Sequence, residues 1–166
     1  MGVSFWSTRC CHEAPRAIAL KFLCDHMLGT LAKWLRFLGY DTAYAGPLDD
    51  TALLEQAKRE RRALLTRDKQ LAGRASGGLG IRSDRLEEQL EEVRRAFGIT
   101  AKNAFSLCSL CNTEIQRLPA EEARGMVPEG VLAGHTEFWR CPTCLRVYWK
   151  GSHFEALERQ IARWTE

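Results

Sequence analysis

The stretch from Leu20 to Gly39 constrains the fold more than any other part of the chain. It begins as a short apolar run that ends in an acid, Asp25, and continues as an amphipathic segment. This pattern predicts a strand, an acid at its carboxyl end, and a helix that stops at the glycine. Ligands of open α/β sheets bind outside the carboxyl ends of the strands, so Asp25 is expected to face a ligand crevice. The apolar face of the helix consists of Leu28, Leu31, Leu35 and Leu38.

The pattern of a strand followed by a helix repeats along the next sixty or so residues. Short apolar or alternating runs are followed by amphipathic segments, with Gly, Pro or Asp between them. Ser83 or Asp84 is expected to cap the last helix, and Gly98 to end it. Such alternation predicts an α/β fold with a mainly parallel sheet flanked by helices and joined by right-handed crossovers. The expected strands are 40–45, 63–66 and 79–82, and the expected helical segments are 50–61, 69–72 and 86–97.

The chain has 166 residues, of which 45% are hydrophobic and 27% charged, a globular composition. We expect a poorly ordered tail at 1–18, an α/β domain at 19–103, a cysteine-rich module at 104–153 and a helix at 154–166. The tail lacks the apolar core of a secretory signal, and no apolar run approaches the roughly 20 residues of a membrane span. We therefore expect no membrane partner and a cytoplasmic location.

The net charge of +3 is unevenly distributed. Residues 1–107 hold 17 Lys and Arg against 13 Asp and Glu, whereas residues 108–166 hold 7 against 8. A basic surface around an acidic pocket suits a polyanion that a metal-dependent enzyme cuts. The alternative is an ordinary solvated surface of mixed charge.

Acidic residues fall where the predicted strands end or the helices begin. They are Asp25, the pair Asp49 and Asp50, and Asp68, with Asp84 as a further candidate. These positions share one edge of a parallel sheet, and carboxylates gathered there would repel one another without a cation. Mg²⁺ prefers a few carboxylates together with water and phosphate, and two such ions could cut a phosphodiester. The alternative for each acid except Asp25 is simple capping of the helix that follows it.

Basic residues near these acids could contact the phosphates of a nucleic acid. Such contacts position the nucleic acid without reading its sequence. For each residue the alternative is a solvated surface charge. The candidates are Lys33, Arg36, Arg67 and Lys69.

Four of the seven cysteines form two C-x-x-C pairs, Cys108 with Cys111 and Cys141 with Cys144. Two such pairs supply the four thiolates of a closed, structural zinc site. Redox chemistry by one pair is the weaker alternative. Aromatic residues beside Arg and Lys follow both sides of the second pair, and they could stack on unpaired bases or form the small core of a zinc ribbon.

Taken together, these features resemble the PIN-like ribonuclease domain found at the C-terminus of the Mut-seven exonuclease, with a zinc ribbon appended. The resemblance covers about residues 20–160. It is carried by the segment 22–41 around Asp25, by Leu64-Leu-Thr-Arg-Asp68, Cys108-Ser-Leu-Cys111-Asn112, Cys141-Pro-Thr-Cys144 and Tyr148-Trp-Lys-Gly-Ser-His153.

The resemblance implies a PIN-like fold and metal-dependent cleavage of RNA. It implies that Asp25, Asp50 and Asp68 are ligands of Mg²⁺ or Mn²⁺, with Asp49 as the alternative to Asp50. Asp84 matches no motif of the family. The zinc ribbon would aid the structure or bind RNA.

We therefore predict a ribonuclease that hydrolyses phosphodiester bonds of RNA, and we leave its oligomeric state open. The main alternative is a non-catalytic adaptor that binds RNA or ribosomes and retains the fold. A receiver-type phosphoacceptor domain also gathers acids around Mg²⁺, but it needs a lysine at a later strand end, where this sequence has no clear one. A zinc-ribbon module for protein interaction is a third alternative.

Overall fold

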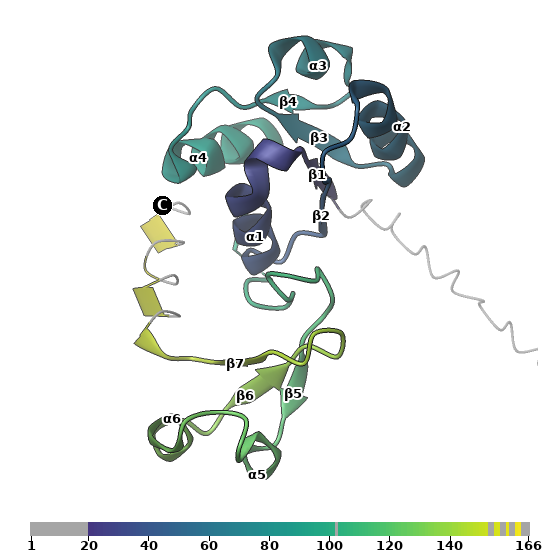
Figure 1. Cartoon of the computed structure of the whole chain (residues 1–166). Helices are drawn as coiled ribbons and strands as arrows, with labels where there is room; N and C mark the ends of the chain where they lie inside the picture. The colour runs from purple at the N-terminus through teal and green to yellow at the C-terminus, as the bar shows by residue number, and fades with distance from the viewer. Residues whose placement is uncertain (1–19, 102, 153–154, 157–158, 160–161, 164–166) are drawn as a thin grey trace, which may run out of the picture.

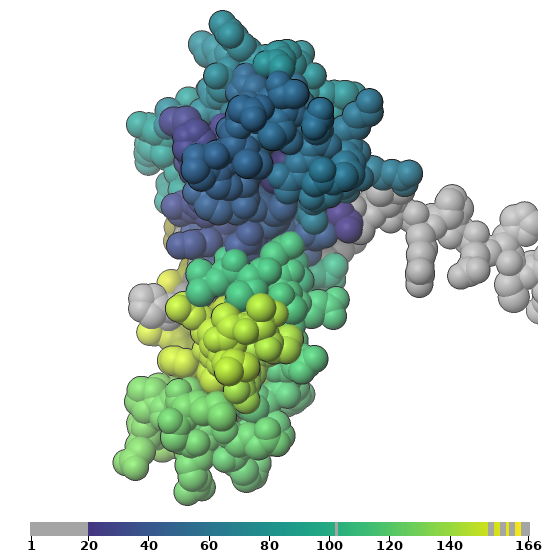
Figure 2. All heavy atoms as spheres, turned by 45° about the vertical axis from the view of Figure 1, so that its right-hand side comes forward, coloured from purple at the N-terminus to yellow at the C-terminus, as the bar shows by residue number. Residues whose placement is uncertain are grey.

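The computed structural model describes residues 20–101, 103–152, 155–156, 159 and 162–163. It has an α/β part built on a parallel sheet and a smaller part built on an antiparallel sheet (Figure 1). In Figure 2 the smaller part, in green and yellow, stacks end to end on the α/β part. The expected tail at 1–18 lies outside the described residues, and so does most of the expected helix at 154–166.

The larger sheet has four strands in the order β2-β1-β3-β4, and each neighbouring pair is parallel. This arrangement confirms the predicted α/β class with a mainly parallel sheet flanked by helices. The strands are short because each apolar run is only a few residues long. They are β1 (Phe22–Cys24), β2 (Thr42–Tyr44), β3 (Ala63–Thr66) and β4 (Leu79–Gly80).

Helices cover both faces of this sheet. Successive side chains of a strand point to opposite faces, so Phe22 and Cys24 pack with α1 and α4, whereas Leu23 packs with α2 and α3. None of the described helices is both long and apolar enough to cross a bilayer. The helices of this part are η1 (His26–Leu28), α1 (Gly29–Phe37), α2 (Asp50–Glu60), α3 (Lys69–Arg74) and α4 (Leu86–Phe97).

Most element positions agree with the sequence, but the N-terminal capping of α4 does not. Its N-cap is Arg85, and no side chain caps it, so the expected cap by Ser83 or Asp84 is wrong. The Ser83 hydroxyl instead donates to Glu88 at 2.7 Å and accepts from the Arg85 amide at 3.0 Å. Gly98 ends the helix in the left-handed conformation, as expected.

The smaller part contains a second, antiparallel sheet in the order β5-β6-β7. Its core is small: Leu118, Ala123 and Phe138 are buried, and two short helices lie between the first two strands. A core of this size needs a further source of stability, such as a bound metal. The elements are β5 (Gln116–Leu118), α5 (Ala120–Ala123), α6 (Glu129–Gly134), β6 (Phe138–Arg140) and β7 (Val147–Trp149).

Arg36 of α1 joins the two parts. Its side chain is buried, and Nε donates to the Thr42 carbonyl at 2.8 Å. Nη1 donates to the carbonyls of Ser109 and Leu110 at 3.0 and 2.7 Å, between the two cysteines of the first pair. Burial lowers the pKa of Arg36 from its ordinary value. This position differs from the expected one, because the guanidinium contacts protein carbonyls in the interior instead of facing RNA.

Asn112 makes a second connection between the parts. Its side-chain oxygen accepts from the Thr42 amide at 2.9 Å, and its nitrogen donates to Asp41 at 2.6 Å. Arg62 donates to the same Asp41 oxygen at 2.7 Å. Burial acts to raise the pKa of Asp41, but hydrogen bonds from Arg62, Asn112 and Lys21 outweigh it and lower that pKa. The Asn112 side chain of the smaller part thereby satisfies a backbone amide on the outer edge of β2.

Replacing Arg36 should destabilise the protein strongly. Arg36→Met would leave three carbonyls without their donor, and we expect a loss of about 3 kcal/mol in the free energy of unfolding. Lys33→Met on the exposed side of the same helix should change it by less than about 0.5 kcal/mol. Urea unfolding of both variants checks this, and equal stabilities would contradict the role of Arg36.

A matched pair of glycines tests the turn that follows α1. Gly39 has a φ of +86°, and a Cβ there would lie 2.2 Å from the Asn103 carbonyl oxygen. Gly98 has a φ of +64° but open space around it. Gly98→Ala should therefore cost about 1 kcal/mol from backbone strain, and Gly39→Ala at least about 3 kcal/mol because backbone must also move. Thermal unfolding should show the larger drop in Tm for Gly39→Ala.

Candidate functional site

Asp25 lies at the carboxyl end of β1 and is almost entirely buried, with 4% of its surface exposed. Its Oδ2 accepts a hydrogen bond from the Thr66 hydroxyl at 2.8 Å. Its Oδ1 lies 2.6 Å from Nδ1 of His26 and also caps the turn η1. The carboxylate is thus held in one orientation by groups on both sides.

The Thr66 hydroxyl connects Asp25 to Asp68. While it donates to Asp25, it accepts a hydrogen bond from the Asp68 amide at 3.0 Å. Thr66 is fully buried at the end of β3, beside β1 in the sheet. The Asp68 carboxylate caps α3 and accepts from the amides of Gln70 and Leu71 at 2.7 and 3.0 Å. The two acids therefore follow neighbouring strands and share one hydroxyl.

Asp49 and Asp50 stand at the start of α2, after β2, and have different partners. Asp49 is the N-cap, and its carboxylate accepts from the Ala52 amide at 2.9 Å. Asp50 is the first helical residue and forms an ion pair with Arg74 at 3.0 Å. About half of each side chain in this pair is exposed to solvent. Capping thus occupies Asp49, whereas an exposed ion pair occupies Asp50.

The acids reach the same edge of the sheet but do not form a tight group. In the part of the chain that the structure describes, the four paired cysteines are the only group of three or more potential metal ligands that lie close together. Asp84 is exposed in the turn between β4 and α4. Metal binding by Asp25, Asp50 and Asp68 would therefore require their side chains to move closer together.

Three of the four candidate basic residues are exposed, in contrast to Arg36. Arg67 and Lys69 flank Asp68 at the carboxyl edge of the sheet, and Lys33 lies on the exposed side of α1. The side chains of these three residues are exposed to solvent, whereas that of Arg36 is buried. They are the cations of this set that a polyanion could reach.

Two residues of this edge were missed from the sequence, Thr66 and His26. Thr66 occupies the last position of an apolar strand, and a hydroxyl there is a signal that could have identified it. His26 follows Asp25 directly, and its ring is about half exposed. The Tyr44 hydroxyl donates to the His26 carbonyl at 2.8 Å and fixes the backbone beside the ring.

The four cysteines form the tightest cluster of potential ligands. Their sulfur atoms all lie within 4.8 Å of one another, and Cys108 Sγ is 3.7 Å from Cys144 Sγ. A tetrahedral zinc with bonds of about 2.3 Å places its sulfur ligands about 3.8 Å apart. The donor atoms and their spacing therefore fit zinc, and the cluster is available because its cysteines form no disulfide.

The two cysteine pairs have the same backbone geometry. In the first pair the Cys108 amide donates to the Thr113 carbonyl, and in the second the Cys141 amide donates to the Arg146 carbonyl. The residue after each second cysteine, Asn112 or Leu145, has a φ of 61°. The repeated turn aims both thiols of each pair at one point.

The electrostatics of the cluster also favour a cation. Burial acts to raise the pKa of Cys108, but hydrogen bonds from the Tyr148 hydroxyl and nearby amides outweigh it and lower that pKa to about 6. The hydrogen bond with Cys144, together with the neighbouring Cys108 charge, raises the pKa of Cys111 to about 12. One thiolate therefore disfavours the next, and a divalent cation would offset that repulsion.

Comparison with known proteins identifies the family. No curated protein and no solved structure matches the chain. A family model described as the Mut7-C RNAse domain matches residues 20–161, which include both the acidic edge and the cysteine cluster. The match agrees with the resemblance found in the sequence, and it shows that the chain belongs to the Mut7-C RNAse domain family.

Proposed function

We propose that the protein is a metal-dependent ribonuclease that hydrolyses phosphodiester bonds at the carboxyl edge of its parallel sheet. The observation that carries this proposal is Asp25, a buried carboxylate held at a strand end by Thr66 and His26. Neither partner is a permanent cation, so a divalent metal ion would relieve the cost of burying the charge. Membership of an RNAse domain family supports RNA as the substrate.

Asp25, Asp50 and Asp68 are the proposed ligands of Mg²⁺ or Mn²⁺. Their oxygen atoms suit these hard cations, although the side chains must draw together. Asp50 would have to leave Arg74, and breaking so exposed an ion pair costs at most about 1 kcal/mol. A bound cation there would supply Lewis acidity at the scissile phosphate.

The remaining residues of this edge would orient the acids and the RNA. The Thr66 hydroxyl donates to the Asp25 carboxylate and accepts from the Asp68 amide. It would thereby orient Asp25 and fix the backbone at Asp68. Arg67, Lys69 and Lys33 are exposed and would bind phosphates of the RNA backbone. The four-cysteine cluster would hold a structural zinc, because four thiolates leave no open position for catalysis.

A non-catalytic RNA-binding adaptor is the second candidate function. It is favoured by the distance between the acids, since only the cysteines form a tight ligand group among the described residues. Such an adaptor would bind RNA through the same cations without cutting it. Cleavage assays separate the two candidates.

Asp25→Asn should abolish cleavage while preserving the fold. The amide oxygen can still accept the Thr66 hydrogen bond, but it carries no charge for a cation. We expect at least a hundredfold loss of RNA cleavage with Mg²⁺ or Mn²⁺ present, and a cooperative unfolding transition that loses at most about 2 kcal/mol because the amide nitrogen cannot cap the His26 amide. Glu55→Gln, an exposed acid of α2, is the matched control and should keep full activity. Full activity of Asp25→Asn would exclude the mechanism.

Zinc removal should affect stability through the smaller part. We expect about one zinc per chain by elemental analysis, and Cys141→Ser should lose it. Cys24→Ala changes a buried cysteine of β1 outside the cluster and should keep the zinc. A strong chelator should unfold the smaller part, because its core is too small to replace the metal. Equal zinc content in the two variants would contradict this assignment.

A further inference from the structure

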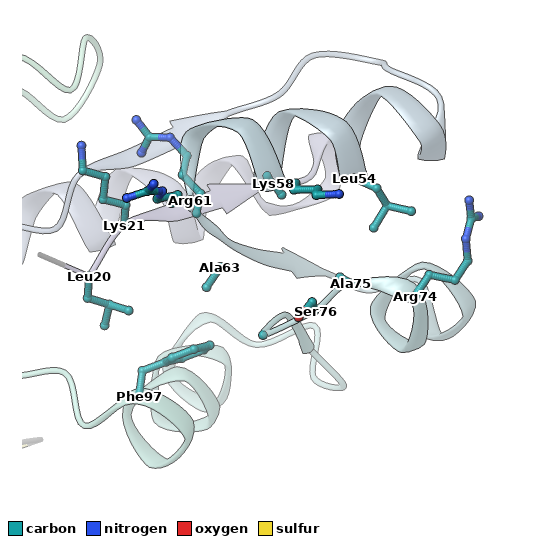
Figure 3. A pocket seen from close by; sticks show the side chains of 13 residues that line it. Leu20, Lys21, Leu54, Lys58, Arg61, Ala63, Arg74, Ala75, Ser76 and Phe97 are labelled. Carbon is teal, nitrogen blue, oxygen red and sulfur yellow. The ribbon is translucent and has the colours of Figure 1, made fainter. Parts of the chain in front are cut away.

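A cavity of about 640 Å³ opens at the amino edge of the parallel sheet, opposite the edge that carries the acids. Residues just before β1 and at the start of β3 line it, together with the C-terminal ends of α3 and α4. In Figure 3, Lys58 and Arg61 lie on the α2 side of the cavity and Phe97 of α4 lies on the opposite side. None of the residues that line it is among the proposed metal ligands or RNA contacts of the cleavage site.

Among the described residues, the cavity is lined by cations and by no acid. Thirteen described residues line it, and five of them are Lys or Arg. Cations gathered at one surface repel one another, and an anionic ligand offsets that repulsion. The five are Lys21, Lys58, Arg61, Arg62 and Arg74.

Two of these cations are free to bind a ligand. Lys21 and Arg62 share Asp41, and Arg74 pairs with Asp50. Lys58 and Arg61 are exposed and have no ion pair within the described ranges of the chain. They lie three residues apart at the end of α2, so they can contact neighbouring phosphates.

Arg61 is also held in an unfavourable backbone conformation. It follows the last residue of α2 and has a φ of 52°, where glycine is the usual residue. A glycine would fit better, so the arginine costs stability at a position where its side chain reaches the cavity.

The interior of the cavity is apolar. Leu20, Leu54, Ala63 and the ring of Phe97 are among the residues that line it. A cationic rim around an apolar floor suits a chain of nucleotides, since phosphates meet the rim while unpaired bases cover the floor. A small inorganic anion would contact only the cations of the rim and leave the apolar floor uncovered.

We propose that this cavity binds a single-stranded segment of RNA, with Lys58 and Arg61 contacting its phosphates. The choice of RNA rests on the proposed ribonuclease function, but the binding itself does not depend on cleavage. Lys21 and Asp25 are four residues apart along β1, so the cavity and the acidic edge are about 13 Å apart. One RNA strand of several nucleotides could therefore contact both edges.

The test compares RNA binding by the wild type and by Lys58→Gln/Arg61→Gly. The glycine suits the backbone at position 61, so the variant should fold at least as well as the wild type. Fluorescence anisotropy with a labelled single-stranded RNA measures binding without cleavage when both proteins also carry Asp25→Asn and no chelator is added, so that the cysteine cluster keeps its metal. We expect about tenfold weaker binding at low salt, and a salt slope of log K smaller by about 1.4 for two lost phosphate contacts.

Arg59→Gln/Arg95→Gln is the matched control, because it removes two exposed cations that do not line the cavity. It should bind RNA like the wild type. Equal weakening of both double variants, or unchanged affinity and slope of the cavity variant, would overturn the proposal. Competition by inorganic phosphate as strong as by RNA would also overturn it, by assigning the site to a free anion. Inactive protein that still binds RNA through Lys58 and Arg61 would refute the ribonuclease function and leave this site standing.

Discussion

The buried guanidinium of Arg36 is the interaction on which the arrangement of the two parts depends. It donates to carbonyls of Thr42, Ser109 and Leu110, and a separation of the parts would break the two hydrogen bonds to Ser109 and Leu110. A hydrogen bond made by a charged group contributes about 1.5 to 3 kcal/mol, so these two bonds help to fix the smaller part on α1. The carbonyls of Ser109 and Leu110 belong to the first cysteine turn, so the geometry of the metal cluster and the position of α1 are linked.

Asn112 shows how one residue serves both parts. The turn after Cys111 requires a positive φ, and asparagine tolerates that conformation better than most residues. The same side chain accepts from the Thr42 amide and donates to Asp41. A glycine would satisfy the turn but leave the edge of β2 without its partner. Zinc binding, through this turn, would therefore also stabilise the end strand of the parallel sheet.

The sequence predicted the local elements better than the contacts between them. The strand at 63–66 and the glycine end of α4 follow from short-range patterns, and the structure confirms them. Arg36 lies off the leucine stripe of its helix, and the pattern therefore indicated exposure, because helical periodicity contains no information on a second part that covers the other side. Thr66 was missed for a similar reason: its importance depends on Asp25 in a neighbouring strand, forty-one residues earlier in the chain.

The short strands keep the two edges of the parallel sheet close together. The two ends of a three-residue strand are only about 10 Å apart. One RNA strand of a few nucleotides could therefore contact the acids at one edge of the sheet and the cations at the other. Arg74 lines the cationic cavity and also holds Asp50 of the acidic edge. An RNA phosphate that draws Arg74 away would free Asp50 for a cation. Occupation of the cavity and assembly of the acids would then favour each other, because both require the same exposed ion pair to open.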